Sequence, residues 1–286
     1  LARGDYRMGR SEDPSEDFRL AEEDLNHAVT LSPDSPMHWT MLGDVHQSRA
    51  NYRTNRSGDS AQAYAAAEDC YSRALKVNPE FARAWGKRAI LRSNRAQQQT
   101  VGGEDPTREF ERSEEDFARA LKLDPKDADT WSARGRMCAN FAYWRYRQTL
   151  DPTVECEGME KHFAAALEIK QDLAVAWQGR GFGRTVTGLF QASRRLDPLP
   201  EWARAEEDLR EAVTRDSDNA WSWLCRGELR YNRALYLELA GDRAEAGRQF
   251  ATAVADFERA IRLKASYGRL IQGRLDDARR KASSEY

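Results

Sequence analysis

The sequence predicts an all-α solenoid of antiparallel helix pairs, and three observations lead to that fold class. First, tryptophan recurs every 46 residues, at Trp39, Trp85, Trp131, Trp177 and Trp223. Second, other columns of small and apolar residues keep the same interval. Third, the apolar residues follow helical spacing, and no stretch alternates regularly enough to predict a strand. A fixed period of this size is typical of stacked helical repeats, which bury their apolar sides against neighbouring repeats.

Small and apolar residues fill the remaining columns. One column is alanine and a second is large and apolar, the latter comprising Leu25, Tyr71, Phe117, Phe163 and Leu209. Glycine follows four of the five tryptophans by four residues, at Gly43, Gly135, Gly181 and Gly227, and Ala89 fills the remaining place. A glycine inside a helix costs ~1 kcal/mol of helix propensity, which close helix packing must recover. We therefore expect the helices to approach closely at this column, with the tryptophans packed in the core.

The chain begins inside an incomplete pair, because residues 1–7 align with residues 224–230, which follow a tryptophan. We therefore expect this chain to be a piece of a longer protein, with a partial repeat over 1–35. Five complete repeats follow over 36–267, at about 36–81, 82–127, 128–173, 174–219 and 220–267. The polar residues after them predict a terminal capping helix over 268–286.

Each repeat predicts two helices. The first begins after a turn that carries Asp or Pro, such as Asp124-Pro125, and it carries the tryptophan and the glycine. The second is clearest over 113–123, where Phe117 and Ala120 lie on the apolar side, acids open the helix and Lys122 lies near its end. That order of charges favours the helix dipole. The proline that follows ends the helix, because it pushes the preceding residue out of helical geometry.

At these positions the chain resembles the tetratricopeptide repeat (TPR) family. The family pattern is W-x-x-L-G-x-x-Y, then A-x-x-x-F, then P, and the matching residues here are Trp39, Leu42, Gly43, Ala67, Tyr71, Ala74 and Pro79. The period of 46 is longer than the family's 34, and the surplus falls around 51–62, 98–109, 144–155 and 189–201. We interpret it as roughly a turn added to each helix plus a longer connecting loop. The resemblance implies a right-handed superhelix with a concave face that binds proteins.

Composition excludes several function classes. A net charge of −2 gives no overall attraction to nucleic acid or to anionic membranes. No apolar run is long enough to span a bilayer, and no secretory signal is present in this sequence. The four cysteines, Cys70, Cys138, Cys156 and Cys225, show no pairing pattern, so we expect reduced, mostly buried thiols and a cytoplasmic protein.

No pattern predicts catalysis, a cofactor or a metal site. The four histidines and the cysteines lack the spacing of a zinc site along the chain. The glycine-rich stretch at 179–183 falls inside a predicted helix, with no strand before it, so it does not predict a phosphate-binding loop. We expect the protein not to be an enzyme.

An arginine column recurs with glutamate 26 residues later, pairing Arg88 with Glu114, Arg134 with Glu160 and Arg180 with Glu206. We predict a repeated ion pair between the two helices of each repeat, because the guanidinium fork suits a carboxylate. Binding of a ligand by these arginines is the alternative.

The resemblance also places certain side chains on the concave face. The predicted partner-binding residues are Arg83, Asn94, Asp129, Arg136, Asn140, Gln178, Phe182, Trp221, Glu228 and Asn232. The amides of Asn94, Asn140 and Asn232 could hold a peptide backbone, since an amide both donates and accepts. They could equally be solvated polar residues.

The expected function is therefore a scaffold that binds a peptide or helix of a partner protein, without nucleic acid, membrane or cofactor. Two alternatives stay open. The repeats could be the regulatory region of a larger signalling protein, such as a bacterial serine/threonine kinase, or they could be a self-assembly element.

Overall fold

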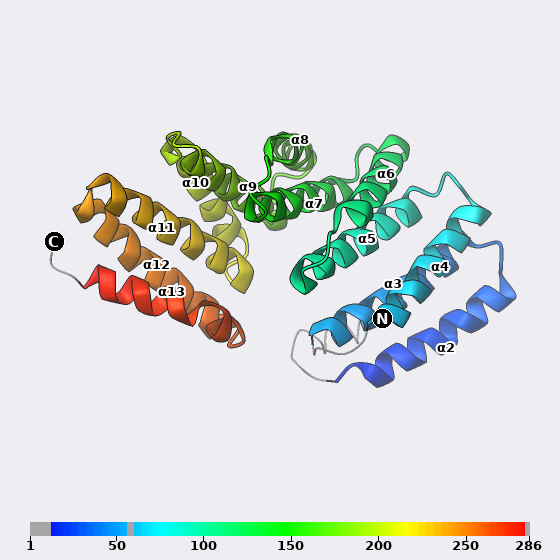
Figure 1. Ribbon diagram of the computed structural model, residues 1–286. Coiled ribbons are helices and arrows are strands. Elements are labelled where there is room, and N and C mark those ends of the chain that lie inside the picture. The colour runs from blue at the N-terminus through cyan, green and yellow to red at the C-terminus, as the bar shows by residue number, and fades with distance from the viewer. Residues whose placement is uncertain (1–12, 56–59, 284–286) are drawn as a thin grey trace. The chain divides into compact units, whose positions relative to one another are not determined.

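The computed structural model describes residues 13–55 and 60–283, and these contain twelve helices and no strand (Figure 1). Consecutive helices pack as antiparallel pairs, which confirms the all-α prediction. None of the twelve helices combines the length and the apolar composition needed to cross a bilayer. The predicted start inside a first helix, at residues 1–7, lies outside the described residues.

The chain divides into two units, Leu1–Thr130 and Trp131–Tyr286. The first unit contains α2 (Ser15–Leu31), α3 (Pro36–Asn55), α4 (Ala61–Val77), α5 (Ala82–Gly102) and α6 (Thr107–Leu123). The second contains most of α7 (Ala128–Arg147), then α8 (Thr153–Ile169), α9 (Ala174–Ser193), α10 (Leu199–Arg215), α11 (Ala220–Ala240), α12 (Arg243–Leu263) and α13 (Tyr267–Ala282). The first helices of the pairs, α3, α5, α7, α9 and α11, begin 46 residues apart.

The additional residues of each period lengthen the first helix. The helices α3, α5, α7, α9 and α11 are each 20 or 21 residues long. The connection from α5 to α6 is only 103–106, although a longer loop was expected around 98–109. The prediction of long loops is therefore wrong, because the glycines and prolines of these stretches mark only the helix ends.

Four of the first helices, α5, α7, α9 and α11, end in one repeated backbone motif. A residue in the left-handed conformation follows the helix, at Gly103 (φ 78°), Thr149 (φ 61°), Arg195 (φ 61°) and Gly241 (φ 89°). The next amide donates back to a carbonyl five residues earlier, as from Glu104 to Gln99 at 2.8 Å. This Schellman cap satisfies helix carbonyls without a side chain.

An aspartate accepts hydrogen bonds at the start of most second helices. The Oδ1 atom of Asp105 accepts bonds from the backbone N–H of Thr107 at 2.9 Å and from its hydroxyl at 2.6 Å. Asp151 accepts the same two bonds from Thr153. A proline stands between each aspartate and its partner, and its fixed φ angle suits the entry to a helix.

The glycine column lets the two helices of a pair approach closely, as predicted. A Cβ atom at Gly43 would lie 2.6 Å from Tyr71, and one at Gly227 would lie 2.6 Å from the ring of Phe257. Both rings are completely buried. Since a methyl group cannot occupy that space, glycine is what allows a large side chain of the second helix to reach the core.

The tryptophan column lies at the edge of the core, where each indole is half-buried. The Nε1 atoms of Trp39, Trp85, Trp177 and Trp223 donate to a backbone carbonyl six residues earlier, at 2.7–2.8 Å. Because the indole N–H needs an acceptor, the ring stays at the turn. In four of the five repeats an arginine of the same helix covers the ring, as at Arg180, 4.8 Å above Trp177, and Arg73 of α4 covers Trp39. The column therefore fastens each first helix to the turn before it.

Candidate functional site

The arginine column forms ion pairs within three repeats, but its partner is an aspartate 28 or 30 residues later. Arg88 donates twice to Asp116, each time at 2.8 Å, and Arg180 makes the same contact with Asp208 at 2.8–3.0 Å. The predicted pairs of Arg88 with Glu114 and of Arg180 with Glu206 are therefore wrong. The acid two residues further on faces the first helix, because residues i and i+2 do not share a helix face.

A second arginine column, which the sequence analysis missed, links neighbouring second helices. Arg92 lies 2.9 Å from Glu68 of α4 and 2.7 Å from Asp116 of α6. Two later repeats have the same arrangement, with Arg184 between Glu160 and Asp208 and Arg230 between Glu206 and Asp256. We call these contacts the ionic ladder. Glu160, predicted to bind Arg134, binds Arg184 at 2.5 Å.

The carboxylates of the ladder's aspartates are almost fully buried. Asp116, Asp208 and Asp256 are 1–2% exposed. Each accepts hydrogen bonds from two arginines, so no ladder aspartate is left as an uncompensated buried charge. This geometry assigns the arginines a structural role and does not favour ligand binding by them.

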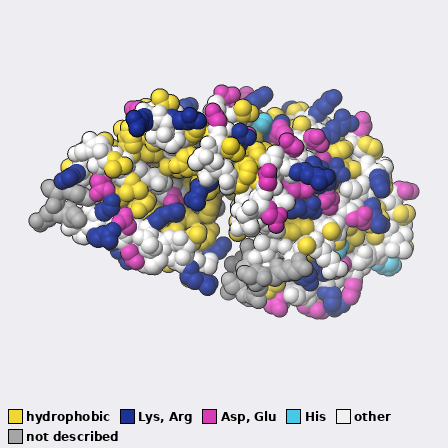
Figure 2. Space-filling model, in the orientation of Figure 1, with side chains coloured by type: hydrophobic (Ala, Val, Ile, Leu, Met, Phe, Trp, Pro, Cys, Tyr) yellow, Lys and Arg dark blue, Asp and Glu magenta, His cyan; other side chains and the backbone are white. Residues whose placement is uncertain are grey.

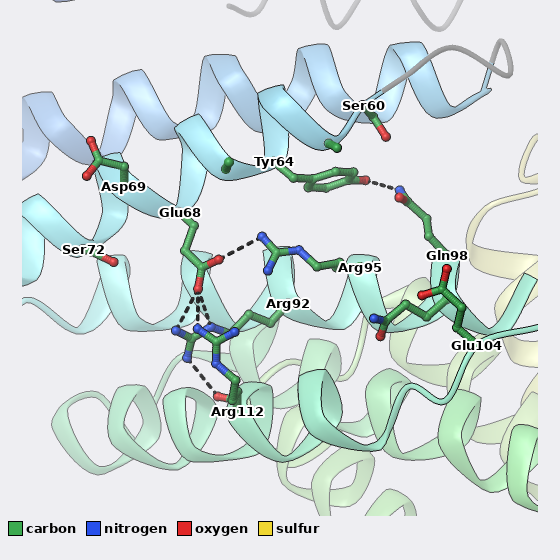
Figure 3. Close-up of a pocket in the computed structure, with 13 residues that line it drawn as sticks. Ser60, Tyr64, Glu68, Asp69, Ser72, Arg92, Arg95, Gln98, Glu104 and Arg112 are labelled. Carbon is green, nitrogen blue, oxygen red and sulfur yellow. Dashed lines mark hydrogen bonds and ion pairs between the residues drawn. The ribbon is translucent and has the colours of Figure 1, made fainter. Parts of the chain in front are cut away.

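A pocket of about 880 Å³ opens beside the ladder in the first unit, between α4, α5 and α6. Figure 3 shows Glu68 at its centre, with Arg92, Arg95 and Arg112 converging on its two carboxylate oxygens at 2.8–2.9 Å. Burial raises the pKa of Glu68, but the hydrogen bonds from Arg92 and Arg95 outweigh burial, so the pKa is lowered overall. The carboxylate of Glu68 and the arginines that line this pocket form ion pairs with one another. None of the lining residues is a histidine or a cysteine, so the pocket lacks those groups for acid–base or nucleophilic chemistry.

The second unit carries a row of aromatic side chains across its first helices. Ring centroids lie 5.9 Å apart between Tyr143 of α7 and Phe182 of α9, and 6.5 Å apart between Phe182 and Trp221 of α11. Trp221 in turn lies 6.1 Å from Tyr267 of α13. We call these four residues the aromatic row. Trp221 is 40% exposed, and the other three are half-buried.

At these repeat positions the first unit carries both charged and apolar residues, Asp44, Arg83 and Asp129 beside Met37 and Ile90. Asp44 of α3 and Arg83 of α5 correspond to Phe182 and Trp221, since each lies 138 residues earlier. The guanidinium of Arg83 lies 3.7 Å from the Asp44 carboxylate, and Lys87 lies 3.3 Å from it. Asp44 also accepts a bond from the buried Tyr71 hydroxyl at 2.9 Å. An ion pair in the first unit therefore takes the place of the two rings in the second.

Five of the eight remaining predicted partner-binding residues reach solvent. Arg83, Asp129 and Arg136 are exposed, and Asn94 and Asn140 are half-buried. The other three form contacts within the protein. Gln178 is buried against the Cys225 sulfur, Glu228 pairs with Arg274, and the Asn232 amide donates to its own helix at 2.7 Å. Burial raises the pKa of Glu228 despite Arg274.

Two members of the aromatic row, Tyr143 and Tyr267, were missed by the sequence analysis. Tyr267 lies 46 residues after Trp221, so its position in the repeat column was available as a signal. Tyr143 had no such signal, because its contact with Phe182 depends on how α7 packs on α9.

Comparison with known proteins places the fold. No family model matches the chain, and no curated protein matches it. Among solved structures, the human IFIT1 dimer with m7Gppp-AAAA is similar to it with a TM-score of 0.55 and 17% identity. That match covers 97% of this chain and 54% of IFIT1, so the chain spans about half of that protein's length.

Two shorter TPR proteins are also similar. YrrB, described as a TPR protein with an unusual peptide-binding site, has a TM-score of 0.47 and 13% identity over 86% of this chain and 100% of YrrB. TTC0263, a TPR protein of Thermus thermophilus, has a TM-score of 0.42 and 19% identity over 79% of this chain and 99% of that one. The antiparallel helix pairs themselves define the TPR-like fold class that the sequence predicts. At these identities the likeness to solved structures concerns the fold alone.

Proposed function

We propose that this protein is a non-catalytic scaffold that binds a peptide or helix of a partner protein across its first-helix faces. The observation that carries the proposal is the aromatic row, which presents a 40% exposed tryptophan beside three half-buried rings. Large rigid aromatic side chains supply much of the binding energy at protein interfaces. If this repeat position served only to pack the core, the indole of Trp221 would not need to be exposed.

The surroundings of the row fit an apolar segment with polar edges. Figure 2 shows hydrophobic side chains gathered over the part of the second unit that α9 to α11 occupy. Val175, in the same repeat column as Trp221, adds a 42% exposed aliphatic group. Glu228 stands one repeat, 46 residues, after Phe182 of the row, and it pairs with Arg274. This ion pair offers charges to the edge of a bound segment. An amphipathic helix that lays apolar residues on such a face is a recurrent mode of recognition.

Two finer points belong to the same proposal. The repeat is a TPR variant of 46 residues, supported by the equal spacing of the first helices. Its division into a partial repeat over 1–35, five repeats over 36–267 and a terminal helix from 268 follows from that spacing. We further propose a cytoplasmic location, supported by four buried free thiols.

The test is partner capture with variants of the row. Immobilised protein is incubated with lysate of the source organism, and captured proteins are quantified for wild type, Trp221→Ala and Phe182→Ala. Since a central aromatic anchor contributes about 2 kcal/mol or more, affinity for the main partner should fall about 30-fold. Leu239→Ala is the matched control, because Leu239 also lies on α11 and is 88% exposed, outside the row.

The Asn94/Asn140/Asn232→Ala triple variant separates the two interpretations of the amides. Reduced capture would show that they hold a peptide backbone, and unchanged capture would assign recognition to the aromatic row alone. Full capture by both Trp221→Ala and Phe182→Ala, with thermal unfolding as in wild type, would defeat the proposal.

A further inference from the structure

The ionic ladder is interrupted in the repeat that begins at Ala128. The ladder arginines Arg92, Arg184 and Arg230 share a column with Cys138, which stands 46 residues after Arg92 and before Arg184. His162 occupies the corresponding aspartate position, 46 residues before Asp208. One repeat thus replaces a buried ion pair with a thiol and an imidazole, the two side chains that prefer thiophilic metal ions.

Both groups come together inside the second unit. The Cys138 sulfur of α7 and a ring nitrogen of His162 of α8 lie within 4.8 Å of each other. Both groups also lie beside Gly158. A Cβ atom on Gly158 would lie 3.5 Å from the Cys138 sulfur and 3.9 Å from Nε2 of His162. Position 158 carries no side chain over the two groups, and Gly158 is itself partly exposed.

The burial and the contacts of His162 favour a role as a metal ligand. Its side chain is 94% buried, given a relative exposure of 6%, and its buried Nδ1 atom has no hydrogen-bond partner within the described residues. The indole of Trp131 lies against the ring at a centroid distance of 5.5 Å, which fixes its orientation.

We propose that Cys138 and His162 bind a single thiophilic d10 cation, of the Cu+ or Zn2+ class, beside Gly158. On binding, the Cys138 thiol releases its proton to solvent and its sulfur bonds to the cation. The His162 nitrogen donates its lone pair, and water completes the coordination. No redox change is involved. The site lies apart from the aromatic row, so it does not depend on the proposed function.

The experiment titrates the purified full chain, reduced and metal-free, with Cd2+ and separately with Cu+ in competition with a chelator. Cd2+ is a spectroscopic probe, because a thiolate–cadmium bond absorbs in the ultraviolet. We expect one equivalent to bind in wild type. Loss of a supporting group around a metal costs about 10–100-fold in affinity, so removal of a ligand in Cys138→Ser or His162→Gln should cost at least about 100-fold.

The decisive variant is Cys138→Arg/His162→Asp, which installs the residues found at these positions in the adjoining repeats. It should fold, as judged by circular dichroism and thermal unfolding, because an arginine–aspartate pair already stands at these positions in the repeat that follows. It should bind neither metal. Cys156→Ser, which removes another buried thiol of α8, should bind as wild type does.

The measurements discriminate between the outcomes. Tight binding of Cu+ or of Cd2+ by wild type that is lost in Cys138→Arg/His162→Asp supports the site, and the preferred metal identifies the class of cation. Equal binding by wild type and by Cys138→Arg/His162→Asp would overturn the proposal. So would the absence of any stoichiometric binding.

Discussion

Asp116, Asp208 and Asp256 show how this fold keeps carboxylates in its interior. Each lies between two arginines, one from the tryptophan-bearing turn of the first helix and one a turn later. A buried ion pair contributes little net stability, because desolvation offsets the attraction, yet removal of one partner is costly. The ladder therefore acts mainly by penalising any sliding of one helix along the next.

Glu68 is the residue whose removal tests this view. Its pKa is lowered from 4.5, so the stability it confers is fully present above pH 4.5 and is lost as pH falls through the lower folded value. Glu68→Gln should lower the free energy of unfolding at pH 7 by roughly 1–3 kcal/mol. The difference from wild type should shrink below pH 4.5, as measured by urea unfolding at a series of pH values. Glu80→Gln, at an exposed position, serves as the control, and a difference that stayed constant with pH would contradict the assignment.

At the scale of elements, the helix pairs and their close approach could be predicted, whereas the helix lengths and the ion pairing could not. Glycine marks two of the first-helix ends, Gly103 and Gly241, but Thr149 and Arg195 hold the same left-handed conformation in the others. Nothing in a threonine or an arginine signals that conformation. The choice between Glu114 and Asp116 likewise depends on helix phase, which two acids on one helix leave open.

Two glycines of similar sequence setting should respond oppositely to alanine. In α11, the Cβ of Gly227→Ala would lie 2.6 Å from the Phe257 ring, so we expect destabilisation of about 1–3 kcal/mol. In α13, Gly273 has no atom within 4 Å of that position, so Gly273→Ala should stabilise by up to ~1 kcal/mol through helix propensity. Chemical denaturation of both variants measures the two signs. Destabilisation by both would show that the close approach is not what selects glycine in α11.

At the scale of the whole molecule, the periodicity of the sequence predicted the fold class, and the proposed binding residues stay a prediction. Phe182 and Trp221 contact each other. Gln178 is buried against Cys225, and the half-buried Asn232 donates to its own helix. Alignment with the family's repeat pattern predicts in which direction a side chain leaves its helix. It does not predict whether other residues of the chain already contact that side chain.

Because each helix packs on its neighbours in sequence, damage should remain local. Asp256→Asn removes the shared partner of Arg226 and Arg230 in α11, a loss of about 3–5 kcal/mol for a buried pair. Amide hydrogen exchange in α11 to α13 should accelerate by about 100-fold or more, while α3 to α5 keep their protection. Mass spectrometry of peptides resolves the two regions. Equal acceleration in both would indicate one cooperative unfolding unit.

The exchange of Asp44 and Arg83 for Phe182 and Trp221 at equivalent positions has an evolutionary consequence. Neither pair belongs to the glycine and tryptophan columns that define the repeat, so an exchange there leaves the packing of those columns in place. Natural selection could therefore change the segments that one repeat binds, from charged to apolar ones, while the neighbouring repeats stay unchanged. Duplication of a module would then supply raw material for a new specificity at little risk to the parent array.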